Sequence, residues 1–226
     1  MSVLFVLTSH DAFGDTGRKT GLWLEEFLAP YYCFIDAGLA VRLASPKGGR
    51  VPVDPASVEA LKDSALYQRY ASDAVLAERM NSTVRLSAVN AGDVSALVYP
   101  GGHGPLWDLR DNPASVALIE SFSGSDKPVA TICHAGCALL DARKSDGRPL
   151  VEGLQVTAFS DSEEAAVGLD KAVPYLVEAD MRALGAVYSK AGDWESHVVV
   201  SGSLVTGQNP ASSLGVADAV MKLLKR

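Results

Sequence analysis

The stretch that most constrains the fold is residues 128–140, PVATICHAGCALL. The buried run VATI stops at a Cys-His pair and is followed by small and helix-forming residues. This pattern predicts a strand over 129–132, a tight turn, and a helix to about Ala142. Cys133 lies at the apex of the turn, where a strand–turn–helix unit exposes a nucleophile. We therefore predict that Cys133 is a reactive thiol.

A helix that begins after Cys133 would present unpaired N–H groups and its positive dipole end to the sulfur, so we expect a lowered pKa for this thiol. Cysteine is often only a small buried hydrophobe, and we interpret Cys33 and Cys137 in that way. Cys133 differs because it ends its strand and has His134 beside it.

A second motif, residues 101–104 (GGHG), follows another buried strand at 95–98. It resembles the backbone-amide oxyanion holes that accompany such elbows, where glycine lets the main chain approach a developing negative oxygen. The candidates for binding substrate and oxyanion are Gly101, Gly102, His103 and, after the elbow, Ala135. The motif lacks the Lys-Ser/Thr of a phosphate-binding loop, and no dinucleotide-binding glycine pattern follows the first strand.

Strands and helices alternate along the chain, which is typical of a parallel sheet with helices on both faces. Besides the strands above, we expect strands at 3–7, 40–44, 155–159, 186–188, 197–200 and 204–205, with helices at 21–37, 112–122, 174–184 and 211–224. Residues 46–94 are interpreted as a helical insertion without a strand. The prediction is one α/β domain over 1–226, doubly wound around six or seven mostly parallel strands. Ligands bind outside the carboxyl ends of such strands.

Composition narrows the partners and the compartment. The net charge is -7, and no basic cluster longer than two residues attracts phosphate, so we expect no nucleic-acid partner. No segment approaches the length of a membrane span, and residues 3–7 are too short for a signal peptide. Three cysteines do not make a disulfide framework, which favours a reducing cytoplasm.

His134 could act as the base for Cys133 if a carboxylate orients its ring. The acidic turn after strand 155–159, which contains Asp161, Glu163 and Glu164, could supply that carboxylate. A zinc site on Cys133, His134 and Cys137 is disfavoured, because zinc usually takes four ligands and no second cysteine pair exists. We predict no metal.

Together these motifs resemble the ThiJ/PfpI superfamily, whose fold is flavodoxin-like and class I glutamine amidotransferase-like. Within it, the chain is similar to the chaperone-like glyoxalase III, or D-lactate dehydratase, branch. The resemblance spans nearly the whole chain and is weakest over about 50–93. It rests on KTG at 19–21 leading to Glu26, GGHG at 101–104, ICH at 132–134, GRPL at 147–150, FSD at 159–161 leading to Glu164, and LVTGQNP at 204–210.

The resemblance implies Cys133 as nucleophile, His134 as its partner, Glu164 as the ring-orienting acid, and Glu26 as a carboxyl group beside the sulfur. Asp161 and Glu163 are the alternates for the orienting acid. The implied reaction needs no cofactor: the thiolate adds to the aldehyde of methylglyoxal, a proton moves between carbons through an enediol, and water releases D-lactate. The chain departs from the family pattern at two places. Ala135-Gly136-Cys137 follow the Cys-His pair, and the insertion is not clearly that of any one subgroup.

Other hypotheses about the function remain open. The same thiol could hydrolyse a C–N bond as a deglycase or amidotransferase-like hydrolase, or serve a redox-sensing or holdase-type chaperone without turnover. The resemblance also implies a homodimer, for which Trp23, Tyr31 and Tyr32 suggest an aromatic surface. Glu26 is expected to face the sheet and Glu25 the solvent, so burial should keep Glu26 protonated beside Cys133.

Overall fold

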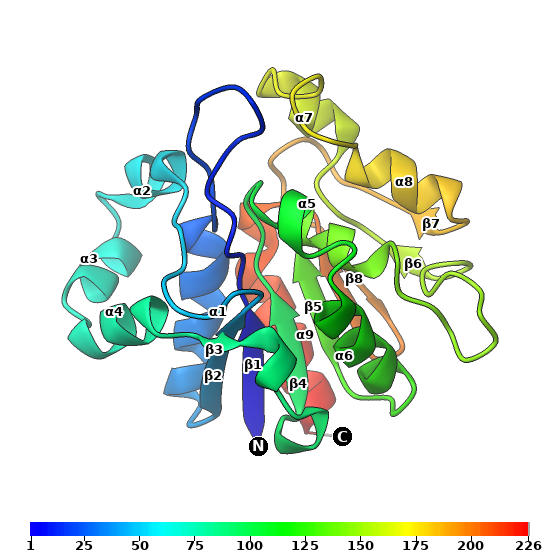
Figure 1. Ribbon diagram of the computed structural model, residues 1–226, viewed down its shortest axis with the longest axis horizontal. Helices are drawn as coiled ribbons and strands as arrows, with labels where there is room; N and C mark the ends of the chain where they lie inside the picture. Colours follow the sequence, from blue (N-terminus) through cyan, green and yellow to red (C-terminus); the bar gives the residue numbers. More distant parts are fainter. Residues whose placement is uncertain (226) are drawn as a thin grey trace.

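The computed structural model describes residues 1–225 and contains a seven-stranded sheet with helices on both faces (Figure 1). The strand order is β3-β2-β1-β4-β5-β9-β8, and every neighbouring pair is parallel except β8 with β9. The strands are β1 (Ser2–Val6), β2 (Ala40–Ser45), β3 (Val84–Arg85), β4 (Ala96–Tyr99), β5 (Val129–Ile132), β8 (Val198–Ser201) and β9 (Leu204–Gly207). The predicted doubly wound α/β class is confirmed.

Both faces of the sheet are covered, as its continuous apolar strands require. Alternate residues of β1 enter different clusters: Val3 and Phe5 pack in one and Leu4 and Val6 in the other. The first cluster includes residues of α1 (Leu24–Asp36) and α9 (Ser213–Leu224), and the second residues of α6 (Pro113–Ser123). In Figure 1, α1 and α9 lie behind the strands, and α6 and the short α5 (Pro105–Asp108) lie in front.

The helix expected over 21–37 begins only at Leu24. Residues 21–23 are extended instead, because Leu22 N–H donates to Pro52 O (2.8 Å) and Trp23 N–H donates to Gly101 O (2.9 Å). The first bond ties residues 21–23 to the loop before α2, and the second ties them to the turn after β4. They place the first turn of α1, which carries Glu26, at the carboxyl ends of the central strands.

The segment 46–94 contains α2 (Pro55–Leu61), α3 (Ala65–Ala71) and α4 (Ala74–Asn81). Asp54, Ser64 and Asp73 cap these helices through their side chains. The expectation of no strand here is wrong, because β3 pairs with β2. Its two residues are exposed and too few to give a periodic signal.

The aromatic surface proposed for a dimer lies largely inside the molecule. Tyr31 and Tyr32 are each 4% exposed. Arg79 on α4 donates to the Tyr31 hydroxyl (3.1 Å), and Tyr32 donates to Asp73 (3.2 Å). The helices of 55–81 therefore cover both tyrosines.

The expected strands near 155–159 and 186–188 do not join the main sheet. The structure has two shorter strands there, β6 (Gln155–Val156) and β7 (Val187–Tyr188), which pair with each other. The chain between them forms α7 (Asp161–Ala166) and α8 (Val177–Ala183). After β6 the chain turns to the end of β9, where Thr157 N–H donates to Thr206 Oγ1 (2.9 Å). This turn brings α7 to the carboxyl edge of the sheet. Across residues 1–225, no helix is both long and apolar enough to cross a bilayer.

Candidate active site

Cys133 occupies a strained turn between β5 and the segment that follows it. Its φ is 59°, a left-handed conformation that is uncommon for a residue with a side chain. The helix expected to run to about Ala142 is a 3₁₀ helix that ends at Leu139. The turn leaves the Cys133 side chain, 3% exposed, at the carboxyl end of the central strand.

A hydrogen-bonded chain connects the thiol to a carboxylate. Cys133 Sγ lies 3.1 Å from His134 Nδ1, and His134 Nε2 lies 2.6 Å from Glu164 Oε2. Glu164 belongs to α7, which Ser160 starts with a capping box. Of the three acids in this turn, Glu164 is the one that contacts the ring, whereas Glu163 accepts from Trp194 N–H and Asp161 N–H donates to Glu178.

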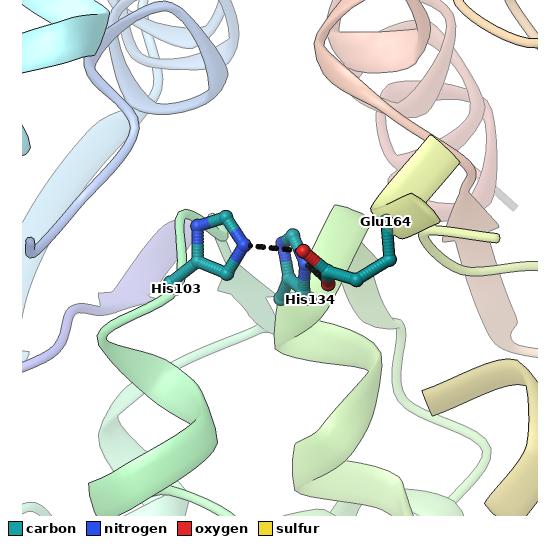
Figure 2. A group of neighbouring side chains, drawn as sticks. All are labelled: His103, His134 and Glu164. Atoms are coloured by element: carbon teal, nitrogen blue, oxygen red, sulfur yellow. Dashed lines mark hydrogen bonds and ion pairs between the residues drawn. The ribbon is translucent and has the colours of Figure 1, made fainter. Parts of the chain in front are cut away.

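Glu164 also binds a second imidazole, as Figure 2 shows: His103 Nε2 lies 2.9 Å from Glu164 Oε1. The two imidazole rings are 4.0 Å apart, centre to centre. His103 was expected to border the substrate, but its contact with Glu164, which joins two segments distant in sequence, was not predicted. No local signal connects the GGHG turn to α7.

The protonation of this group follows from its contacts. Burial would raise the pKa of Glu164, but the hydrogen bonds from His103 and His134 outweigh it and lower the pKa to about 2. Burial and the neighbouring His103 lower the pKa of His134 to about 4. His134 is therefore neutral at pH 7, and we assign its proton to Nε2 because the Glu164 carboxylate accepts there. Nδ1 then faces the thiol as an acceptor.

Glu26 is the second carboxyl group of the site. It is fully buried, and its Oε2 accepts from Gly101 N–H at 2.7 Å. Oε1 has no hydrogen-bond partner within residues 1–225. Burial raises the pKa of Glu26 to about 8, so the group is protonated at neutral pH.

The glycine turn supports this carboxyl group. A Cβ on Gly101 would lie 2.7 Å from Glu26 Oε2 and 3.0 Å from Cys133 Cβ, so a side chain does not fit there. The N–H of Gly101 is occupied by Glu26 and does not face a substrate oxygen, contrary to expectation. The N–H of Gly102 is directed at Cys133, and its role in holding a substrate oxygen stays a prediction.

The expectation of a lowered pKa for Cys133 is wrong. Burial raises the pKa of this thiol well above its usual range, and the nearby Glu26 raises it further, against the opposing N–H groups of His134 and Gly102. The N–H groups were foreseen, but the burial was not. Deprotonation of Cys133 therefore needs a base, and His134 Nδ1 is within reach of the sulfur.

These groups surround a small cavity of about 60 Å³. Its lining comprises Trp23, Glu26, Gly102, His103, Cys133, His134, Phe159, Val167, Trp194 and Pro210. The apolar members of this wall were not predicted, because they come from loops that are distant in sequence. The predicted Ala135 is absent from the lining as far as residues 1–225 show, and it packs in the core beside Cys137. A wider groove of about 500 Å³ shares Trp23, His103 and Val167 with the cavity.

The ligand atoms of His103, His134 and Glu164 all lie within 4.8 Å of one another, close enough to hold a metal ion. In this structure the carboxylate accepts from both rings instead. The zinc set considered from the sequence does not assemble, because the Cys137 thiol donates to Pro105 O at 3.3 Å and packs in the other core cluster from Cys133.

Comparisons with known proteins identify relatives of this chain. The DJ-1/PfpI family profile matches residues 20–223. The glutathione-independent glyoxalase HSP31 of Saccharomyces cerevisiae is 31% identical, over 99% of this chain and 98% of that protein. The 24 kDa rapid encystment protein (REP24) of Francisella tularensis superposes with a TM-score of 0.94 and 34% identity, over 99% and 98% of the two chains. Glyoxalase III of Candida albicans shares the fold, with a TM-score of 0.90 and 24% identity over 99% and 97%.

Proposed function

This chain belongs to the DJ-1/PfpI family, and from that premise we propose that it is a glutathione-independent glyoxalase that converts methylglyoxal to D-lactate through Cys133. The observation that carries the proposal is the 3.1 Å contact of Cys133 Sγ with His134 Nδ1, next to a protonated Glu26. A base and an acid thus flank one nucleophile. This is what addition of a thiol to an aldehyde requires.

In the first step Cys133 Sγ bonds to the aldehyde carbon, and His134 Nδ1 takes the thiol proton. Glu26 gives its proton to the aldehyde oxygen, which yields a neutral hemithioacetal. The Gly102 N–H faces the sulfur and is placed to steady the developing charge beside it. Glu164 holds the imidazolium through its 2.6 Å hydrogen bond to Nε2.

The Glu26 carboxylate then removes the proton from the carbon bonded to sulfur, while His134 protonates the neighbouring carbonyl oxygen, and an enediol forms. Glu26 returns the proton to that neighbouring carbon, and His134 takes the proton of the hydroxyl next to sulfur. The product is a lactoyl thioester on Cys133. Delivery from one fixed carboxyl group explains how a single enantiomer would arise.

Water completes the cycle. It attacks the thioester carbonyl, one of its protons goes to Glu26, and the C–S bond breaks as His134 returns a proton to sulfur. The cycle adds one water to methylglyoxal and restores every group to its starting protonation state. Glu26 and His134 together account for each proton transfer.

The decisive experiment measures D-lactate formation from methylglyoxal without glutathione. Cys133→Ala should abolish it, whereas Cys33→Ala, a partly buried cysteine on α1, should match the wild type. Turnover by Cys133→Ala would overturn the nucleophile. A wild type that forms no D-lactate yet has a thiol that oxidises readily would favour the redox-sensor alternative.

We further propose a homodimer, which the family resemblance suggests, and a cytoplasmic location, which the three free cysteines suggest. Because Tyr31 and Tyr32 are buried, the dimer interface would have to lie elsewhere. Sedimentation at micromolar concentration tests the assembly, and a monomer there would contradict it.

A further inference from the structure

Trp194 is the most unusual residue of the cavity wall. Its φ is 65°, a left-handed conformation that is rare for a bulky side chain. Its indole packs at a tilt against Phe159, with ring centres 5.7 Å apart, and lines the cavity while remaining 49% exposed. A strained backbone that presents an aromatic side chain to a reactive site points to a function.

A buried carboxylate outside the proposed chemistry holds this conformation. Glu163 is fully buried, and its Oε1 accepts from Trp194 N–H (2.9 Å) and from Asn209 Nδ2 (2.8 Å). Its Oε2 accepts from the N–H and hydroxyl of Ser160 (3.0 and 2.8 Å). All four partners are donors, so a carboxylate fits this position and an amide does not.

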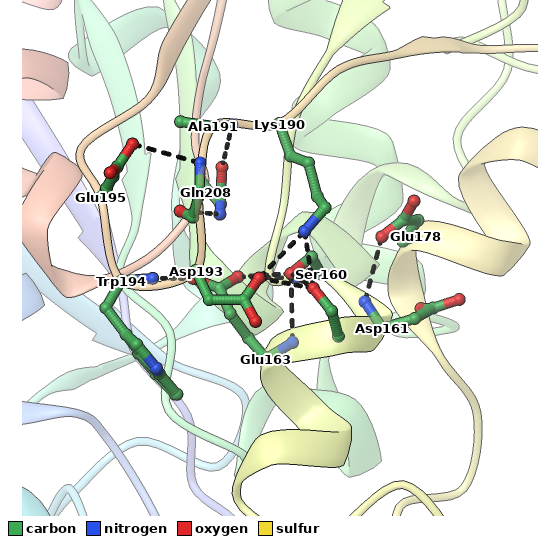
Figure 3. A network of polar contacts seen from close by, with 12 residues as sticks. Ser160, Asp161, Glu163, Glu178, Lys190, Ala191, Asp193, Trp194, Glu195 and Gln208 are labelled. Atoms are coloured by element: carbon green, nitrogen blue, oxygen red, sulfur yellow. Dashed lines mark hydrogen bonds and ion pairs between the residues drawn. The ribbon is translucent and has the colours of Figure 1, made fainter.

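Further bonds fix the loop that carries Trp194 (Figure 3). Lys190 Nζ donates to Asp193 Oδ1 at 2.9 Å and to Ser162 Oγ at 2.6 Å. Ala191 N–H donates to Gln208 at 2.9 Å. The loop is thus tied both to α7, which carries Glu164, and to the segment after β9. These bonds therefore hold the loop that carries the indole in place beside the residues around Cys133.

We infer that Trp194, positioned by Glu163, is the residue that limits substrate size, restricting the site to 2-oxoaldehydes with a small alkyl group. This inference rests on the proposed function. The cavity of about 60 Å³ has room for only a few waters, and Trp194, Phe159 and Pro210 are among the residues that line it. An aryl group on the 2-oxoaldehyde would meet the indole. Removing the indole opens the wall to solvent.

The first test measures access to Cys133 and does not depend on turnover. The rate of alkylation of Cys133 is compared for iodoacetamide and for a bulky N-aryl iodoacetamide, with peptide mapping to isolate this thiol. In Trp194→Ala the bulky-to-small rate ratio should rise about tenfold or more, the usual scale for relief of a steric block in an apolar pocket. Leu214→Ala, which removes an exposed apolar side chain on α9, should leave the ratio unchanged.

The second test measures kcat/KM for phenylglyoxal relative to methylglyoxal. Trp194→Ala should raise this ratio by a similar factor, mainly through KM for phenylglyoxal, and Trp194→Phe should raise it less. An unchanged ratio in both tests overturns the inference. If the alkylation ratio rises but the wild type turns over neither aldehyde, Trp194 does limit access to Cys133 and the proposed glyoxalase function fails.

Glu163 is tested as a positioning residue. Glu163→Gln replaces one carboxylate oxygen, which accepts two hydrogen bonds, with an amide NH₂ group, so it should loosen Trp194 and shift both ratios in the same direction, by less than Trp194→Ala. The double variant should match Trp194→Ala alone, because Glu163 acts on selectivity through the indole. Additive effects of the two substitutions on the ratio would contradict this role.

Discussion

Glu26 on α1 and Glu164 on α7 are both buried beside the elbow, 0% and 3% exposed, yet the pKa of Glu26 is raised to about 8 and that of Glu164 is lowered to about 2. Glu164 accepts from two imidazoles, whereas Glu26 accepts from one backbone N–H and keeps one oxygen unpartnered within residues 1–225. At Glu164 the hydrogen bonds from the two imidazoles outweigh burial, whereas at Glu26 burial outweighs the Gly101 N–H and the nearby Cys133 thiol. One site thereby holds an acid and an anion.

The largest effect is expected on the ionised side. Glu164→Gln places an amide N–H against one of the two imidazoles and no longer fixes the His134 proton on Nε2. With the proton on Nδ1, the ring cannot accept from the thiol, and kcat should fall by roughly 10³ to 10⁴. The measurement is steady-state D-lactate formation. Asp161→Asn, on the same helix, is the control and should cost little.

A smaller effect is expected on the protonated side. Glu26→Gln keeps the bond from Gly101 N–H and a donor near the sulfur, but it cannot exchange a proton with the substrate. Loss of this acid and base should lower kcat by roughly 10² or more. Glu25→Gln, on the partly exposed neighbour, should do little. Wild-type turnover by Glu26→Gln would remove Glu26 from the proton transfers and leave a thiol-only chemistry.

The sequence pattern predicted those features of the site that each lie within one short stretch of the chain. The strand before Cys133, the glycine turn and the burial of Glu26 all follow from periodicity over short stretches. The contact of His103 with Glu164 and the position of Trp194 could not be foreseen, because each joins loops that only the assembled sheet brings together. The short strands β3, β6 and β7 were misplaced or missed for a related reason. Two residues cannot show a period.

The pKa of Cys133 shows a different kind of failure. The sequence indicated N–H groups near the sulfur, and those of His134 and Gly102 are present. What reverses the shift is burial and the approach of Glu26, which depend on how Gly101 lets α1 close against the elbow. The sign of a pKa shift is a balance of burial, charge and hydrogen bonding, and local sequence supplies only part of it.

The pH profile offers a third way to separate the two carboxyl groups. The profile of kcat/KM should rise through about pH 4, as His134 loses its proton and becomes a base, and should fall through about pH 8, as Glu26 loses the proton it donates. In Glu26→Gln the alkaline fall at about pH 8 should disappear while the acid rise remains. An alkaline limb that persists in this variant would assign it to another group.

The smallest expected effect concerns stability, where the two glutamates should differ in sign. The folded state holds the Glu26 proton with a pKa of about 8, whereas the unfolded chain releases it near 4.5, so this group's stabilisation is present below 4.5 and is lost as pH rises to about 8. The loss is at most about 1.4 kcal/mol per pH unit in that window. Glu26→Gln removes this dependence, and its unfolding free energy relative to wild type should therefore increase from about pH 5 to about pH 8, by a few kcal/mol at most.

Glu164 has a lowered pKa, so its contribution to stability is present above pH 4.5 and is lost as pH falls towards 2. Glu164→Gln should therefore be least stable relative to wild type at neutral pH. Urea denaturation of both variants at these pH values measures the two trends. If the Glu26→Gln difference is flat with pH, Glu26 is ionised throughout, and the contrast between the two carboxyl groups fails.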